Sequence, residues 1–350
     1  RNLDDIFKVQ DEIARSVVDT LKVKLLGDPV SQRATPRNTQ AYDLYLRGQY
    51  FYRQLGEDRL VRAREFYNRA LELDPDMALA CYGLSGVYIN EILSGVRTTE
   101  QGLPLAMESL NQALELDPNL ANAHYTLGFV RMVFDWDFKG AEDAFRRAQQ
   151  IEPNSAPAYS GLGLLMSIHG QTTEAIEYQR RSLEIDPLRG PSLHNLGVVA
   201  YFGGDYQLAE ETFRDVLRLT EDYARGYYYI SVSVMLQQRL EEALAEIAKE
   251  PADHYRLAGM ALTSHALGRE EESSAAIREL SDKHGDKAAF LIAEAHAYRG
   301  EHSLALQWLD RAVDQHEPVV PWIRNSPFLV DLHADPGFSD LLRRIGLEDN

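Results

Sequence analysis

Few residue patterns in this chain could support catalysis. Gly161-Leu162-Gly163 matches the start of a dinucleotide-binding fingerprint, but it lacks the third glycine and the preceding strand. Asp135 and Asp137 could act as an acid–base pair or as metal ligands, yet no third acidic residue follows at a calcium-loop spacing. We interpret the glycines as points of close helix packing and the aspartates as part of a polar turn held by a buried tryptophan.

The histidines and the single cysteine do not indicate a catalytic or metal site either. Most histidines lie in the last third of the chain, but no two are four residues apart on one helix, as a zinc site would need. These are His254, His265, His284, His296, His302, His316 and His333. The single cysteine, Cys81, excludes an internal disulfide and lies in an apolar helical pattern, where a free thiol acts as a small hydrophobe. We therefore predict a non-enzyme with no metal and no cofactor.

Charge narrows the classes of partner. The chain has 54 acidic and 36 basic residues and a formal net charge of −18. Binding to nucleic acid or to an anionic membrane needs clustered Lys and Arg, so neither is expected of this region. A basic protein partner would be favoured electrostatically. Because the chain starts at Arg1 and lacks a membrane-length apolar run, we expect a fragment of a cytoplasmic protein.

The elements that position these residues repeat along the chain. Four segments end in an acidic residue followed by proline, and the residue before a proline disfavours the α conformation. The prolines are Pro75, Pro118, Pro153 and Pro187, at spacings of 43, 35 and 34 residues. Apolar residues at helical spacing follow these stops, which predicts a succession of helix, turn, helix and stop.

Small residues recur in register within the units. A Leu-Gly pair is followed about a dozen residues later by an alanine, then by a large residue, then by a small or β-branched one. Glycine or alanine where two helices cross lets them approach closely. The successive positions are Leu127-Gly128, Leu162-Gly163 and Leu196-Gly197; Ala141, Ala175 and Ala209; Phe145, Gln179 and Phe213; and Ala148, Ser182 and Val216.

This order of residues over 34 positions resembles the tetratricopeptide repeat (TPR). The resemblance implies an all-α fold, a right-handed superhelical solenoid of about eight helical hairpins. The expected units are 39–77, 78–120, 121–155, 156–189, 190–223, 224–252, 253–285 and 286–318. The first three carry insertions in their turns. The later ones depart from the pattern, because Glu221 replaces the expected proline and the unit at 224–252 is short.

Three further segments resemble a more specific arrangement. Residues 4–14, the Phe-Asp-Trp-Asp-Phe turn at 134–138 and the closing segment 335–347 are similar to the C-terminal TolB-like and TPR region of bacterial multidomain cyclases or winged-helix regulators. The resemblance implies the regulatory arm of a larger bacterial signal-transduction protein. No cyclase or winged-helix sequence is present, so neither activity is carried over.

We expect four parts in the chain. Residues 1–27 form an amphipathic helix, 28–38 a proline-containing linker, 39–318 the solenoid, and 319–350 an irregular segment with a capping helix. The first helix either caps the first repeat or belongs to an upstream domain, and we favour the second alternative. The last helix, from about 336 to 345, would cover the apolar face of the final repeat, as solenoid ends require.

The first helix of each unit should line the concave face, so groove residues can be read from the helical period. Many are tyrosines, which combine apolar area with a polar tip and suit interfaces, although some of these rings could equally be core. The predicted protein-binding groove comprises Tyr42, Tyr45, Gln49, Tyr52, Tyr82, Asn122, Tyr125, Phe129, Met132, His194, Tyr201, Phe202, Tyr228, Met235, Tyr255 and Tyr298.

Two non-catalytic functions remain open. The groove has few of the cations with which some repeats of this kind hold a terminal carboxylate, so we predict an apolar or aromatic peptide groove. In the first function, the chain is a scaffold that binds a segment of another protein there. In the second, it associates with itself as a homodimer, or with an attached cyclase or DNA-binding output domain, and controls that domain.

Overall fold

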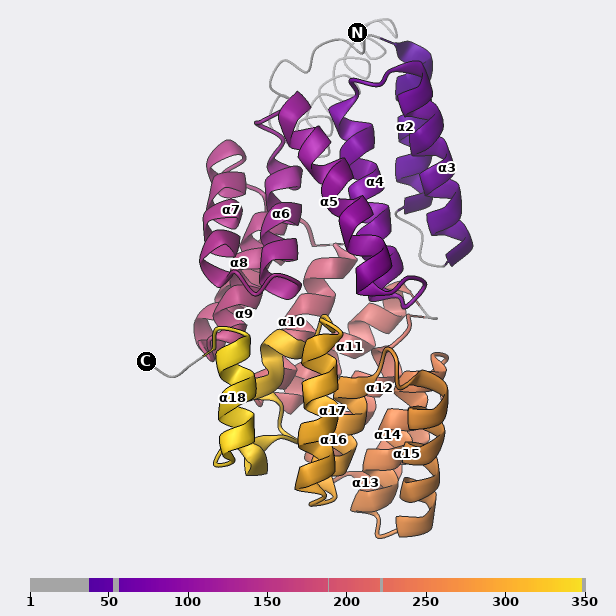
Figure 1. Cartoon of the computed structure of the whole chain (residues 1–350), viewed down its shortest axis with the longest axis vertical. Coiled ribbons are helices and arrows are strands. Elements are labelled where there is room, and N and C mark those ends of the chain that lie inside the picture. Colours follow the sequence, from indigo (N-terminus) through magenta and orange to yellow (C-terminus); the bar gives the residue numbers. More distant parts are fainter. Residues whose placement is uncertain (1–37, 53–56, 188, 221–222, 348–350) are drawn as a thin grey trace, which may run out of the picture.

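The computed structural model describes residues 38–52, 57–187, 189–220 and 223–347 (Figure 1). This part is helical, and no strand occurs in it. Eight antiparallel helical hairpins follow one another, so the prediction of an all-α repeat solenoid is confirmed. The predicted N-terminal helix and most of the predicted linker lie outside the described residues.

Each hairpin pairs an inner helix with an outer one. The inner helices are α2 (Thr39–Tyr52), α4 (Ala78–Leu93), α6 (Ala121–Val133), α8 (Ala156–Ile168), α10 (Gly190–Phe202), α12 (Gly226–Leu236), α14 (Asp253–Ala266) and α16 (Ala289–Tyr298). The outer helices are α3 (Glu57–Leu73), α5 (Thr99–Leu116), α7 (Phe138–Ile151), α9 (Thr172–Ile185), α11 (Tyr206–Leu219), α13 (Leu240–Ile247), α15 (Glu270–His284) and α17 (His302–Asp314). Two short 3₁₀ helices, η1 (Val320–Asn325) and η2 (Val330–Leu332), and the helix α18 (Pro336–Arg344) close the chain.

The acid–proline pairs end helices as predicted. The residues Asp117, Glu152 and Asp186 are the C-caps of α5, α7 and α9, and their backbone is extended or close to it, with ψ between 88° and 92°. Proline at the next position enforces this conformation. The stops therefore set the length of these outer helices and the start of the next hairpin.

Aromatic rings of the outer helices pack against the recurring glycines of the inner helices. The buried ring of Phe145 on α7 lies between Gly128 of its own hairpin and Gly161 of the next. A Cβ atom at Gly128 would lie 2.6 Å from this ring, and one at Gly161 would lie 2.5 Å from it. Tyr67 on α3 is held in the same way between Gly48 and Gly83. One ring thus joins two successive inner helices, and glycine is needed on both.

The fourth hairpin replaces this ring by a polar network. Gln179 is fully buried at the position of Phe145, and its Nε2 donates to the backbone oxygen of Ser160 at 2.9 Å. The Ser160 hydroxyl donates to Gln179 Oε1 at 2.8 Å and accepts from Asn195 Nδ2 at 2.9 Å. Because each buried amide group has a partner, the glutamine is tolerated in the core.

The end of the chain folds back on the middle of the solenoid. The helix α18 packs on α17 and buries Phe338 and Leu341, whereas η1 packs against α6 and α8 (Figure 1). The indole of Trp322 on η1 stacks on Phe202, and its Nε1 donates to Ser167 Oγ at 3.2 Å. The C-terminal segment therefore covers part of the inner face of the central hairpins.

A second contact closes the superhelix. Trp136 has a positive φ of 55° in the turn before α7, and its half-buried ring stacks on His316 with centroids 4.4 Å apart. Nδ1 of His316 lies 2.8 Å from the backbone oxygen of Phe134. Asp137 caps α7 by accepting from the backbone N–H of Gly140 at 2.9 Å. The polar turn is confirmed, but its tryptophan contacts the last repeat and is only half buried.

The ring-into-glycine packing can be tested with Gly161→Ala. The added methyl group would collide with the Phe145 ring, and overpacking of this kind costs about 1–3 kcal/mol of unfolding free energy. The matched control is Gly190→Ala, where a Cβ would meet nothing within 4 Å. Urea denaturation followed by circular dichroism should show a lower midpoint for Gly161→Ala alone. Equal midpoints for the two variants would contradict the packing argument.

Candidate protein-binding cavity

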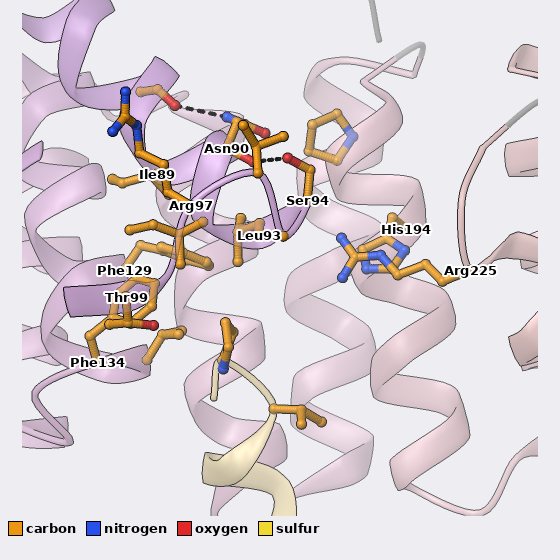
Figure 2. A pocket seen from close by; sticks show the side chains of 18 of the residues that line it. Ile89, Asn90, Leu93, Ser94, Arg97, Thr99, Phe129, Phe134, His194 and Arg225 are labelled. Carbon is orange, nitrogen blue, oxygen red and sulfur yellow. Dashed lines mark hydrogen bonds between the residues drawn. The ribbon is translucent and has the colours of Figure 1, made fainter. Parts of the chain in front are cut away.

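The inner helices line a large, open cavity in the described part of the chain. Its volume is about 2320 Å³, and its lining comes from hairpins along the whole solenoid and from the segment around Trp322. Figure 2 shows part of this lining, including Phe129 and Phe134. The contact between the last repeat and the turn before α7 completes the wall. The cavity is therefore a product of the closed superhelix and of no single repeat.

Most of the predicted groove residues line this cavity. They are Tyr45, Gln49, Tyr52, Tyr82, Asn122, Tyr125, Phe129, His194, Tyr201, Phe202, Tyr228 and Tyr255. Four of these, Tyr45, Tyr201, Phe202 and Tyr228, expose 2–7% of their surface and are core residues at its wall.

Four predicted groove residues lie elsewhere. Met132 and Met235 are 0% and 1% exposed and belong to the core, because both lie on helix faces turned towards neighbouring helices. Tyr298, at the end of α16, packs on Phe328 and His265 with ring centroids 5.3 and 5.4 Å apart. Tyr42 packs on Tyr45 behind the cavity wall. These positions do not form part of the candidate site.

The N-terminal half of the cavity is rich in aromatic side chains. Asn90 Nδ2 donates to the Tyr52 hydroxyl at 2.8 Å, and this hydroxyl lies beside Gly86 of α4. Burial raises the pKa of Tyr82 to about 12 and also raises the pKa values of Tyr52 and Tyr125. These phenols therefore stay protonated at neutral pH and can donate hydrogen bonds to a ligand. Ile89, Leu93 and Phe129 add apolar surface beside them.

Cations line the centre of the cavity, where the sequence analysis predicted few of them. Arg189 and Arg225 are the residues immediately before α10 and α12. Figure 2 shows the side chains of Arg225 and His194 next to each other at the cavity wall. Burial and the charge of Arg225 hold the pKa of His194 well below its ordinary value. Arg189 was missed because it precedes α10 and lies outside the helical period from which the groove was read.

Buried carboxylates anchor the C-terminal segment to the cavity wall. Glu294 on α16 accepts from Ser326 Oγ at 2.6 Å and from the Tyr228 hydroxyl at 3.3 Å. Glu317 accepts from the backbone N–H groups of Ala289 and Phe290 at 2.6 and 3.2 Å and so caps α16. Burial raises the pKa of each carboxyl group to about 7.

Among the described residues, no group of three His, Cys, Asp or Glu side chains is arranged to hold a metal ion. None of the described helices is both long and apolar enough to span a membrane. The features that the cavity offers a ligand are thus aromatic walls, phenol hydroxyls and a cationic centre.

The raised pKa of Glu294 predicts a pH-dependent stability. Its folded-state pKa of about 7 exceeds the ordinary 4.5, so this group stabilises the fold fully below pH 4.5, and that contribution is lost as pH rises through 7. The difference corresponds to about 3 kcal/mol. Glu294→Gln should remove this dependence of the unfolding free energy on pH. Relative to wild type, the variant should therefore gain unfolding free energy between pH 5 and pH 8 in urea denaturation. The exposed Glu115→Gln should follow wild type, and parallel profiles for Glu294→Gln would refute the assignment.

Three family models match parts of the chain. One described as a TPR repeat matches residues 100–132, and two described as a tetratricopeptide repeat match residues 156–187 and 194–254. A curated relative, "Putative adenylate cyclase 3" of Rhizobium meliloti (strain 1021), is 35% identical over 96 residues. This match covers 27% of the chain and 16% of the length of the relative.

Two solved structures are similar to this chain. The human IFIT1 dimer with m7Gppp-AAAA is similar with a TM-score of 0.59 at 13% identity, covering 86% of this chain and 77% of that one. The yeast Tom70 structure has a TM-score of 0.49 at 13% identity, and the match covers 98% of this chain and 78% of that one. Likeness at such identity concerns the fold alone. With repeat motifs in register and consecutive helical hairpins, this chain is a tetratricopeptide-repeat protein.

Proposed function

We propose that the chain is a non-catalytic module that binds an extended segment of a partner protein in its cavity. The observation that carries this proposal is the size and lining of the cavity. Its volume of about 2320 Å³ exceeds the roughly 300–1,000 Å³ of ordinary small-molecule pockets. Tyrosines, which are enriched among the residues that dominate protein interfaces, line it from several inner helices.

The lining favours an apolar or aromatic segment. Tyr82, Tyr125 and Phe129 can pack against aliphatic and aromatic side chains, while neutral phenols can donate to backbone carbonyls. Exposed carboxylates also line the cavity, and they favour a basic residue at the flank of the bound segment. These are Glu100, Asp135, Asp186, Asp286 and Asp314.

The similarity to a putative adenylate cyclase supports a place in signalling. Our proposal includes a role as the regulatory or docking arm of a larger bacterial protein in the cytoplasm. The same similarity favours a second candidate, in which the solenoid associates with itself or with an attached output domain. Light scattering tests self-association: a dimer whose mass does not change with dilution supports it, and a monomer contradicts it.

The binding proposal can be tested with peptides selected on the immobilised wild-type chain. Tyr82→Ala and Tyr125→Ala should each weaken the selected peptides about tenfold or more, because truncating a central aromatic contact costs about 1–2 kcal/mol or more. The matched control is Tyr50→Ala, since Tyr50 is 65% exposed and does not line the cavity. Fluorescence anisotropy measures the affinities. If no peptide is selected, or if all three variants bind alike, the cavity is not the binding site.

A further inference from the structure

The first described hairpin carries an aromatic surface outside the cavity. Phe51, at the end of α2, stacks on Phe66 of α3 with ring centroids 5.5 Å apart and ring planes 7° from parallel. Tyr50, which is 65% exposed, packs nearly perpendicular to Phe51 with ring centroids 5.3 Å apart. These three residues do not line the cavity, so its proposed use does not account for them.

Arginines of α3 lie over both ends of this aromatic stack. The guanidinium carbons of Arg59 and Arg62 lie 6.0 and 5.8 Å from the centre of the Phe51 ring. The guanidinium carbon of Arg69 lies 5.9 Å from the centre of the Phe66 ring. At these distances the ring faces attract the cations. All three arginines are exposed. We call these five residues the arginine–aromatic strip.

The three arginines of the strip form no ion pair with any described carboxylate. Elsewhere on the surface, a carboxylate four residues before an arginine pairs with it, as Glu142 does with Arg146 at 2.7 Å. Glu65 likewise precedes Arg69 by four residues, yet the two are not paired. A guanidinium held over a ring can still donate to an acceptor, because its N–H groups lie in its own plane. The strip therefore presents donors for carboxylates of another molecule.

The strip lies on a side of the first hairpin that no other described hairpin covers. Arg64 of α3 pairs with Glu91 of α4 and so marks the side that faces the second hairpin. Arg62 and Phe66 are each two positions from Arg64, which places them about 160° around the helix from it. No described hairpin precedes α2 and α3 (Figure 1). A partner can therefore approach the strip at this end of the solenoid.

We propose that the arginine–aromatic strip is a docking site for an acidic amphipathic helix of a partner protein. Arg62 and Arg69 are seven positions apart, about 10 Å along α3, and the stacked rings of Phe51 and Phe66 join them. A partner helix lying along α3 matches this spacing with two carboxylates seven positions apart and apolar side chains between them. The carboxylates accept from the guanidinium groups while the apolar side chains cover the rings.

Charge complementarity decides for an acidic partner. The chain has a net charge of −18, so most of its surface repels an acidic segment. At physiological salt such repulsion is largely screened beyond about 8 Å, so the groups in contact decide the binding. Within the strip these groups are three arginines and two aromatic rings, residue types that are enriched at protein interfaces. This docking site goes beyond the proposed function, because it is separate from the cavity.

The probe is a fluorescein-labelled helical peptide with Glu at its first and eighth positions and Leu at its fourth and fifth. Titration with the whole chain, followed by fluorescence anisotropy, should show saturable binding. The affinity should be at least about tenfold higher than that of the same peptide with Gln in place of both Glu residues. Raising the salt from about 50 to about 500 mM should weaken the acidic peptide. Absence of saturable binding, equal affinity of the Gln peptide, or salt-independent binding would overturn the proposal.

Arg62→Gln and Arg69→Gln should each weaken the acidic peptide about threefold or more, and the double variant about tenfold or more, because each removes a charged donor. The matched control is Arg180→Gln, since Arg180 is exposed on α9, outside the first hairpin. The substituted side chains are all exposed, so the thermal midpoints should stay close to that of wild type. Full affinity in the double variant refutes the docking site.

Other occupants of the strip give different results. Loss of the acidic peptide with Tyr82→Ala would place it in the cavity and contradict the proposal. Tighter binding of a single-stranded oligonucleotide, lost in the double variant, would assign the strip to nucleic acid. A dimer in light scattering that the double variant dissociates would assign it to a second copy of the chain. Either of these assignments overturns the proposal. The proposed function is tested separately, by the loss of selected peptides with Tyr82→Ala.

Discussion

The placement of one aromatic ring between two glycines is the constraint on which the architecture depends. Phe145 contacts Gly128 in its own hairpin and Gly161 in the next, so a single side chain fixes both the hairpin angle and the step between repeats. Tyr67 does the same for the first two hairpins. Because these contacts recur, the inner helices are brought side by side and their remaining faces form a continuous wall.

Closure of this wall depends on contacts of a different kind. Trp322 stacks on Phe202, and His316 stacks on Trp136. The two residues of each pair lie far apart in the sequence. Glu294 and Glu317 then hold the C-terminal segment through hydrogen bonds that bury both carboxyl groups. The non-repetitive segment thus adds Pro318, Val319 and Trp322 to the lining that the repeats provide.

The sequence predicted what is local and periodic. Helix ends at acid–proline pairs and the number of hairpins follow from spacing, and most groove tyrosines follow from the helical period. The closing contacts were not predictable, because Trp136 and His316 are far apart in the chain and neither recurs in the repeat. Met132 and Met235 were wrongly predicted to line the groove. An inner helix has neighbours on most sides, so few of its side chains can reach the groove. Arg189 was not predicted to line the groove because it precedes α10 and so has no place in the helical period.

Buried polar residues are distributed over the whole described fold. Gln179 is as deeply buried as any core residue, yet the nitrogen and the oxygen of its amide each have a partner. Ser233 and Ser264 bury hydroxyl groups without a partner away from the cavity, and the Tyr201 hydroxyl does so at its wall. An unpaired buried donor therefore does not by itself mark a binding surface in this fold. The feature that distinguishes the cavity is the set of aromatic side chains that several inner helices contribute to its lining.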